Sequence, residues 1–409
     1  MPTTVNERGH VGLFITANWH RQFSYFNEIR QTSPSERPNY WQVFRTYFAN
    51  DVMAGEGAAP LFVTYEGSQV YSPIPYIPYA AAAFVAKALD LSFLWTLYLL
   101  RLTGLIVTSA MIAYAIAVTP FLKWTFVCVA MLPTTIYQRA VISIDGVALG
   151  ATLLVVASCL AAVLAPRRLL LRGLCITLCS LTKPPQVAFA LLEAMHIPFT
   201  AWSTQWRSFL LITVPGLALA LAWIVVALLD IPAWRAGAVI GLSSDEFGPL
   251  QKLQVLLTYP GQFVTAVITT LDDSVEMWKQ VIGVFGWLDT AMQDWAYPVL
   301  SVLLLASFID NSEFSRPVRT RIACVSFVTA MIYFVGVFVV FFMTETPTGA
   351  ARIYGLQGRY FLVVVPVAAV TVSALLNRSL GRGRSWVAIT SSLVSVAAMT
   401  EALWRVHWV

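Results

Sequence analysis

Four ionisable side chains stand in or beside apolar stretches of this chain, where charge is costly. Arg101 lies inside the stretch 93–118, and Asp145 and Arg359 each precede another apolar stretch, whereas Lys183 is followed by two prolines. A charge in hydrocarbon costs several kcal/mol unless it is paired or hydrated, so such residues are candidates for binding or catalysis. An acid could orient a substrate or move a proton, and the cations could bind phosphate or carboxylate.

Each of the four also has a structural interpretation. Arg101 could extend its guanidinium to the membrane interface or pair with a neighbouring helix. Asp145 follows Ser143 at a helix start, where a carboxylate stabilises the helix by about 0.5–2 kcal/mol. Lys183 and Arg359 could anchor helix ends at the interface. The sequence leaves both interpretations open for each residue.

Aromatic and amide side chains accompany these charges. Tyr71 and Tyr76 lie in the proline-rich segment 71–78, whose rings suit a membrane interface, either as a binding surface or as an aromatic belt. Gln357 precedes Arg359 between glycines, which let the chain bend near a ligand.

The composition identifies an integral membrane protein. The chain of 409 residues has 58% hydrophobic and 11% charged residues and a mean hydropathy of +0.71, which is wrong for a soluble domain. The hydrocarbon core takes about twenty apolar residues per helix, so the chain is long enough for about nine or ten spanning helices. The alternating segments of a β-barrel are absent from the sequence. We therefore predict an all-α polytopic membrane bundle.

The predicted spans include a hairpin-like pair separated at Lys183, and short interfacial helices accompany them. The spans are expected at 93–118, 121–137, 146–164, 169–181, 187–201, 208–229, 296–309, 322–344, 360–376 and 385–400, and the interfacial helices at 77–89, 253–259 and 263–271.

Basic residues in alternate loops predict the orientation, because cytoplasmic loops are rich in Lys and Arg. This places residues 1–91 outside the membrane as a leader with an interfacial helix, and 92–409 in the bundle, with an outer loop over 230–292. The apolar stretch 11–17 of the leader is too short to span a membrane and lacks the basic flank and cleavage pattern of a signal sequence. We expect either a first helix lost upstream or translocation of the leader without one.

Other classes of site have little support. The five cysteines fall in apolar stretches and are expected to be buried. Cys175 and Cys179 share a helix face, which could suggest metal, but no histidine lies nearby in sequence. Nucleotide-binding loops and nucleophile elbows are not found. The net charge of +5 is explained by cytoplasmic loops, so a nucleic-acid partner is not expected.

Five short motifs occur in an order that resembles the bacterial multipass family catalogued as domain of unknown function 2142. They are Tyr71-Ser72-Pro73-Ile74-Pro75-Tyr76, Arg101, Ser143-Ile144-Asp145-Gly146, Thr182-Lys183-Pro184-Pro185 and Gln357-Gly358-Arg359-Tyr360. That family looks related to the GT-C glycosyltransferases, which take a sugar from a polyprenyl phosphate carrier at the outer face. The resemblance implies a GT-C-like bundle in a bacterial cytoplasmic (inner) membrane, acting on a glycan or another envelope acceptor.

The resemblance also implies roles for individual residues. Family members carry an Asp-Glu-Pro-x-His-like segment after a first helix, where GT-C enzymes hold their catalytic carboxylate, and this chain shows neither. The expected catalytic acids are Asp145, by orienting groups or holding a metal, and Asp51, as a substitute base. The expected substrate-binding residues are Arg101, Gln138, Lys183, Gln357, Arg359, Tyr71 and Tyr76. No cofactor is expected, and a divalent metal is left open.

Two other functions compete with glycosyl transfer. Broken helices near Lys183 could line the path of a transporter or flippase of lipid-linked sugars, although transporters usually repeat such a break in their second half. A truncated, non-catalytic family member that binds carrier lipid is the third possibility.

Overall fold

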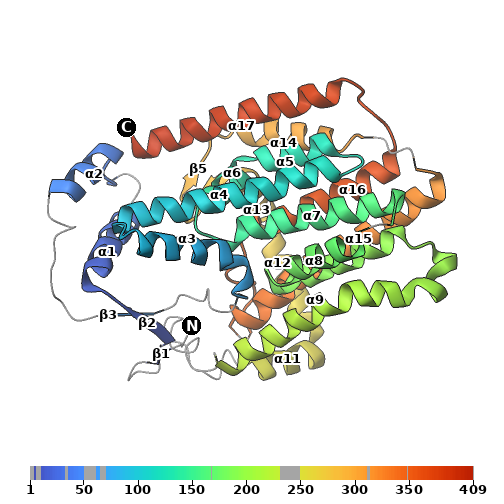
Figure 1. Cartoon of the computed structure of the whole chain (residues 1–409), viewed down its shortest axis with the longest axis horizontal. Coiled ribbons are helices and arrows are strands. Elements are labelled where there is room, and N and C mark those ends of the chain that lie inside the picture. The colour runs from blue at the N-terminus through green and yellow to red at the C-terminus, as the bar shows by residue number, and fades with distance from the viewer. Residues whose placement is uncertain are drawn as a thin grey trace.

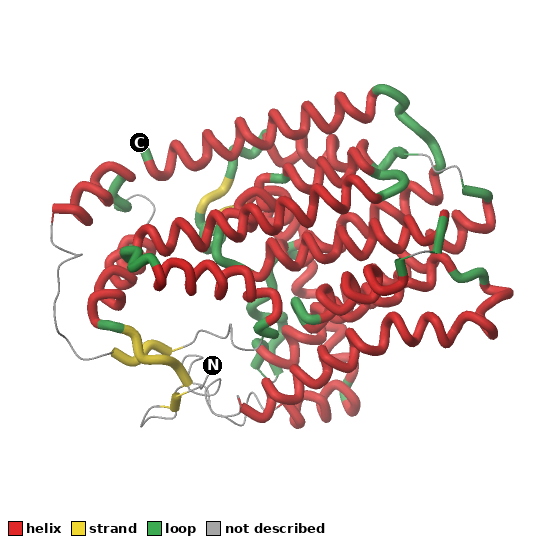
Figure 2. The backbone as a smooth tube through the Cα atoms, in the orientation of Figure 1, coloured by secondary structure: helices red, strands yellow, loops and turns green. Residues whose placement is uncertain are grey.

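The computed structural model describes residues 4–5, 11–32, 36–49, 61–64, 71–166, 168–230, 249–310, 314–347 and 349–408 (Figure 1). These residues are mainly helical, and their strands form two small antiparallel sheets. Figure 2 shows the long helices side by side, running along the longest axis of the molecule. The predicted all-α polytopic bundle is confirmed.

Six helical segments among the described residues are long and apolar enough to cross a membrane. An uninterrupted apolar run makes a helix hydrophobic on every side, as a membrane span requires. These segments are formed by α4 (Phe93–Val118), α7 (Ile144–Leu164), the consecutive η4 (Phe199–Ala201) and α9 (Trp202–Asp230), α15 (Arg316–Thr344), the consecutive η6 (Gly358–Val364) and α16 (Val365–Leu376), and α17 (Gly383–His407).

Shorter apolar helices complete the bundle. Pro133 divides the second predicted span, because proline is well suited to the first turn of a new helix. The predicted hairpin pair is confirmed, and its two arms separate at Lys183. These elements are α5 (Lys123–Met131), α6 (Pro133–Ala140), α8 (Leu169–Ser180), the 3₁₀ helix η3 (Pro184–His196) and α14 (Ala296–Ser307).

α7 lies at the centre of the bundle. Of its apolar window, 72% is buried inside the protein, against 22% for α4. α4, α8 and η3 all pack against it. Because α7 is surrounded by other helices, a side chain at its first turn can lie inside the protein and away from lipid.

The helices reverse at two ends of the bundle. We call one of them the arginine-rich end. It holds the turns that follow α4, α7, η3, α14 and α16, and basic residues lie in or next to these turns. Contacts tie these turns together: the Leu122 N–H donates to Asp310 Oδ2 at 2.8 Å, and Arg321 Nε donates to the carbonyl oxygen of Met195 at 2.7 Å. The opposite end, from which α4, α7, η3 and η6 start, we call the leader end. That the arginine-rich end faces the cytoplasm stays a prediction.

Short elements cover the leader end, and helices predicted at 77–89, 253–259 and 263–271 are among them. The small leader sheet, in the order β1-β2-β3, was not predicted. The elements are β1 (Thr4–Val5), β2 (Val11–Ile15), β3 (Leu61–Thr64), α1 (Ala17–Gln31), α2 (Tyr40–Ala49), η2 (Ile74–Tyr76), α3 (Ile77–Ala88), α11 (Pro249–Thr258), α12 (Pro260–Leu271), α13 (Ser274–Gly283), β4 (Val284–Phe285) and β5 (Thr290–Ala291).

One prediction about the cysteines is wrong. Cys128, Cys159, Cys175 and Cys179 are buried as expected, but Cys324 is exposed on the protein surface. Cys324 lies on α15, which is apolar over most of its length, so hydropathy does not reveal which side of this helix packs inward.

Candidate functional site

The start of α7 holds Asp145 at the leader end. Ser143 caps this helix, and its hydroxyl accepts a hydrogen bond of 3.1 Å from the Asp145 N–H. Gly146 packs so closely that a Cβ there would lie 2.9 Å from the carbonyl oxygen of Gln138. The carboxylate is therefore fixed where α6 meets α7, and 15% of its side chain is exposed.

Lys183 reaches Asp145 from the turn between α8 and η3. Its Nζ binds Asp145 Oδ1 and lies 4.6 Å from the centre of the Tyr360 ring. The turn is attached to α7, because Gln186 Nε2 donates to the carbonyl oxygen of Ala148 at 3.1 Å. The ammonium group thus lies near both a carboxylate and an aromatic ring, and each stabilises a cation.

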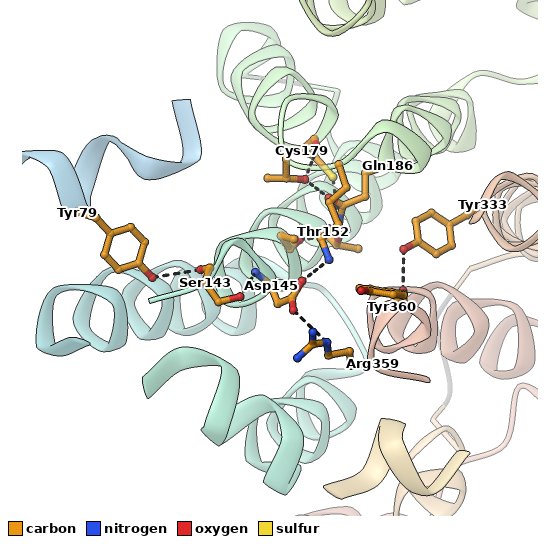
Figure 3. Close-up of polar contacts among 12 residues, drawn as sticks. Tyr79, Ser143, Asp145, Thr152, Cys179, Gln186, Tyr333, Arg359 and Tyr360 are labelled. Carbon is orange, nitrogen blue, oxygen red and sulfur yellow. Dashed lines mark hydrogen bonds and ion pairs between the residues drawn. The ribbon is translucent and has the colours of Figure 1, made fainter. Parts of the chain in front are cut away.

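Arg359 approaches the same carboxylate from the start of η6. Its Nε lies 3.6 Å from Asp145 Oδ2, an ion pair without a hydrogen bond (Figure 3). Gly358 determines this approach: its N–H donates to Gln280 Oε1 at 2.6 Å, and a Cβ there would lie 1.8 Å from the carbonyl oxygen of Met277. A residue without a side chain is required at this contact with α13.

We call Asp145, Lys183 and Arg359 the Asp145 cluster. Their side chains are 15%, 12% and 27% exposed, so water screens their charges less than it would on an open surface. Each residue lies at or next to the first residue of a helix, namely α7, η3 or η6. Helix N-termini carry partial positive charge and unpaired N–H groups. The two cations outnumber the single carboxylate, and this excess of positive charge beside three helix starts favours a bound anion.

Three buried polar atoms in and beside this cluster have no hydrogen-bond partner among the described residues. They are Arg359 Nε, Gln357 Oε1 and Gln138 Oε1. Buried polar groups in folded proteins are almost always paired. Gln357 is adjacent to Gly358, and the Gln138 backbone lies against Gly146. A ligand with both hydroxyl groups and acceptor oxygens could pair such atoms.

Tyrosines in the proline-rich segment and directly after it come close to the cluster. The Tyr79 hydroxyl donates to the carbonyl oxygen of Ser143 at 3.3 Å (Figure 3), and its ring centre is 6.4 Å from that of Tyr76. Burial raises the pKa of Tyr76 above its ordinary value, and Tyr71, Asp145 and Tyr79 add to the effect electrostatically. The Tyr76 phenol is therefore a neutral hydrogen-bond donor near Asp145.

Arg101 lies apart from the Asp145 cluster. Its Nε donates to the carbonyl oxygen of Ala140 at 2.8 Å, and its side chain lines a cavity of about 690 Å³ between the leader and the bundle. Tyr137 lines the same cavity and lies within electrostatic reach of both Arg101 and Arg359. Arg101 therefore packs against α6, and among the described residues it forms no hydrogen bond or ion pair with Asp145.

The sequence also predicted Asp51 as a second acid and left a divalent metal open. Asp51 lies outside the described residues. In the described part of the chain, no group of three or more His, Cys, Asp or Glu side chains could hold a metal ion. Asp145 offers a single carboxylate that already faces two cations, which does not fit the several oxygen ligands of a divalent site.

Sequence reasoning missed residues that support the cluster from other helices. The Tyr333 hydroxyl donates to the carbonyl oxygen of Tyr360 at 2.7 Å, and the Tyr360 ring stacks on Phe341 with centres 4.9 Å apart. Tyr360 follows Arg359 directly. Aromatic residues are common at the start of a span, so Tyr360 did not stand out in the sequence. Tyr333 and Gln280 give no signal in the sequence, because their partners lie far away along the chain.

Fold and cluster together define a polytopic helical membrane protein with a charged, partly buried cluster at one end. The chain belongs to the family described as "Predicted membrane protein (DUF2142)", whose model matches residues 40–368. This confirms the family indicated by the five motifs, all of which lie within the matched residues. Neither a search of curated proteins nor one of solved structures found a match.

Proposed function

We propose that this protein is a membrane glycosyltransferase that moves a sugar from a polyprenyl phosphate carrier to an acceptor at the outer face of a bacterial cytoplasmic membrane. The observation that carries the proposal is the meeting of Lys183 and Arg359, from two distant helix starts, at the Asp145 carboxylate. The reaction class, transfer of a sugar from a lipid carrier, is taken from the family's resemblance to the GT-C glycosyltransferases. In this proposal the leader end faces outward.

Lys183 and Arg359 bind the phosphate of the carrier. The phosphate gains negative charge as its bond to the sugar breaks, and preorganised cations in a partly dehydrated site stabilise that charge. Arg359 Nε is buried without a hydrogen-bond partner, so its guanidinium can turn toward a phosphate oxygen without losing a hydrogen bond at this atom. Lys183 stays in place, held by Asp145 and Tyr360.

The transfer itself needs an acceptor, a base and a leaving group. The acceptor oxygen forms a bond to the anomeric carbon, the bond from that carbon to the phosphate oxygen breaks, and its electron pair leaves with polyprenyl phosphate. The acceptor proton passes to a base. Attack from the face opposite the phosphate inverts the anomeric centre.

Asp145 acts in this proposal as a positioning residue. Both of its oxygens face cations, so the carboxylate has little tendency to accept a proton. It holds two like charges together at the place where phosphate binds. Asp51 stays the candidate base predicted from the sequence.

A transporter or flippase of lipid-linked sugars is the second candidate, and two observations favour it. η3 in the first half of the chain and η6 in the second half are both 3₁₀ helices that begin beside the Asp145 cluster, and irregular helices in both halves are typical of transporters. Arg172 and Glu193 also form a buried ion pair of 2.9 Å between α8 and η3, with side chains 2% and 0% exposed. Buried charges of this kind are common on transport pathways.

One experiment separates these functions. The purified full chain is placed in proteoliposomes with radiolabelled polyprenyl phosphate sugars and a mixture of envelope glycans. Glycosylated product supports the transferase, exchange of the labelled lipid between leaflets without product supports the transporter, and lipid binding alone supports a non-catalytic member. For the transferase, Arg359→Ala should abolish product while membrane insertion is retained, and full activity in this variant would exclude Arg359 from the site.

A further inference from the structure

A cavity of about 690 Å³ lies between the leader and the bundle. Its walls come from α1, α2, α4, α6 and the turn between β4 and β5. Ligand pockets for small organic molecules have volumes of roughly 300–1,000 Å³. Aromatic side chains form much of its wall, among them Tyr40, Tyr98, Tyr137 and Trp287.

Charged groups stand among these rings. Arg101 lines the cavity, and so do Arg37 and Asp289, whose Nη2 and Oδ2 are 3.0 Å apart. The other oxygen of Asp289 accepts a hydrogen bond of 3.2 Å from the Trp287 N–H. The Arg37–Asp289 pair therefore fixes the turn that carries Trp287, and it joins the leader to the bundle.

Tyr137 connects this cavity to the Asp145 cluster. It lines the cavity, its ring centre is 5.6 Å from that of Phe285, and it lies within electrostatic reach of Arg101, Arg359 and Asp289. Tyr137 is followed by Gln138, whose carbonyl oxygen lies against Gly146 at the start of α7, so the cavity adjoins the helix start that carries Asp145. Two substrates that exchange a sugar must meet at such a boundary.

We infer that this cavity binds the acceptor of the transferase, and that the acceptor is a saccharide. The inference rests on the proposed function. A sugar ring has a face of C–H groups, which suits the electron-rich face of an aromatic ring, and an edge of hydroxyls, which suits charged hydrogen-bonding groups. The cavity offers rings and three charged side chains together. An acyl chain would gain nothing from the charges, so lipid is the less suitable occupant.

Saccharide binding to the detergent-solubilised full chain tests this inference. Saturation-transfer NMR is recorded with three probes: maltotriose, an N-acetylglucosamine trimer and a galacturonic acid trimer. At least one probe should bind, and Trp287→Ala should weaken that binding about tenfold, or about 1.4 kcal/mol. Trp386→Ala is the matched control, because Trp386 on α17 is 67% exposed, close to the 69% of Trp287, and does not line the cavity.

The outcomes are distinct from those of the proposed function. Failure of all three probes to bind, or equal binding by wild type and Trp287→Ala, overturns the inference. If Trp287→Ala instead weakens the binding of polyprenyl phosphate, the cavity holds carrier lipid and the inference is wrong. If saccharides bind as expected while wild type fails to bind polyprenyl phosphate, the proposed donor fails and the saccharide site survives.

Discussion

The ammonium group of Lys183 binds one oxygen of the Asp145 carboxylate and leaves the other oxygen to Arg359. Lys183 comes from a turn between two helices of the first half of the chain, and Arg359 from a helix start in the second half. One carboxylate therefore links both halves at the leader end. Substitutions can test the Asp145 carboxylate, the packing that places Arg359, and the contacts at each end of the bundle separately.

Asp145→Asn should destabilise the protein, because Lys183 and Arg359 would repel each other without a carboxylate between them. We expect a loss of at least about 1 kcal/mol in the free energy of unfolding. Inorganic phosphate should restore more thermal stability to this variant than to wild type, since an anion can take the place of the carboxylate. Thermal unfolding in detergent measures both effects, with Glu401→Gln as a control, because Glu401 is a partly exposed carboxylate on α17, away from the cluster. Equal responses of variant and wild type to phosphate would count against an anion site.

Gly358→Ala should destabilise the protein by about 1–3 kcal/mol, because the added methyl group collides with backbone and no side chain can move aside. The new Cβ would lie 1.8 Å from the carbonyl oxygen of Met277. Gly261→Ala is the matched control: nothing lies within 4 Å of a Cβ there, so this variant should be neutral or slightly stabilised. Denaturant unfolding of the two variants compares them directly, and equal stabilities would contradict the packing described for η6.

The leader should loosen from the bundle only in acid. Partial burial acts to raise the pKa of Asp289, but the hydrogen bond and charge of Arg37, with the N–H groups of Asp289 and Trp287, lower it overall. A carboxyl group whose pKa is lower in the folded protein than in the unfolded chain stabilises the fold. This stabilisation is complete above the unfolded pKa, about 3.9, and is lost as the pH falls through the folded pKa. Hydrogen exchange in α1 and α2, corrected for intrinsic exchange rates, should therefore rise below about pH 4.

Arg37→Gln supplies the control for this acid effect. Without the guanidinium, the pKa of Asp289 should lie closer to its ordinary value, and the acid-dependent rise in exchange should shrink. The same rise in Arg37→Gln as in wild type would show that another group loosens the leader.

Asp310→Ala should destabilise the arginine-rich end. Asp310 Oδ2 accepts from the Leu122 N–H at 2.8 Å, its other oxygen binds Arg384, and its carbonyl oxygen accepts from Ser373 Oγ at 2.7 Å. Loss of the side chain leaves a buried N–H unpaired, which costs about 1–3 kcal/mol. The same substitution at the exposed Asp272 should cost little. Denaturant unfolding decides between these expectations, and equal losses would contradict the role of Asp310 in joining these turns.

The sequence predicts the bundle well because its signals are local. Long apolar runs mark the spans, and two prolines mark the turn at Lys183, whereas the division of the predicted span 121–137 at Pro133 was not predicted. The side of each helix that packs inward is not a local property when the helix is apolar over most of its length. This is why the exposure of Cys324 was missed.

The candidate site was predictable in part. Charged residues in apolar surroundings singled out Asp145, Lys183 and Arg359, and the structure brings these three together. Arg101 has the same signal, but its guanidinium donates to the carbonyl oxygen of Ala140 on α6 instead of meeting Asp145. The type and position of a single residue in the sequence do not reveal which helix start, far away along the chain, it contacts in the folded protein. The supporting contact of Gln280 with Gly358 depends on tertiary packing alone.

Binding of polyprenyl phosphate to the purified full chain tests the central claim most directly. Arg359→Gln and Lys183→Gln should each weaken binding by at least about tenfold, or about 1.4 kcal/mol. Arg352→Gln should bind like wild type, because Arg352 pairs with Asp273 at an exposed position, with side chains 45% and 58% exposed. Affinities of Arg359→Gln and Lys183→Gln equal to that of wild type would contradict the claim that the Asp145 cluster binds the carrier phosphate.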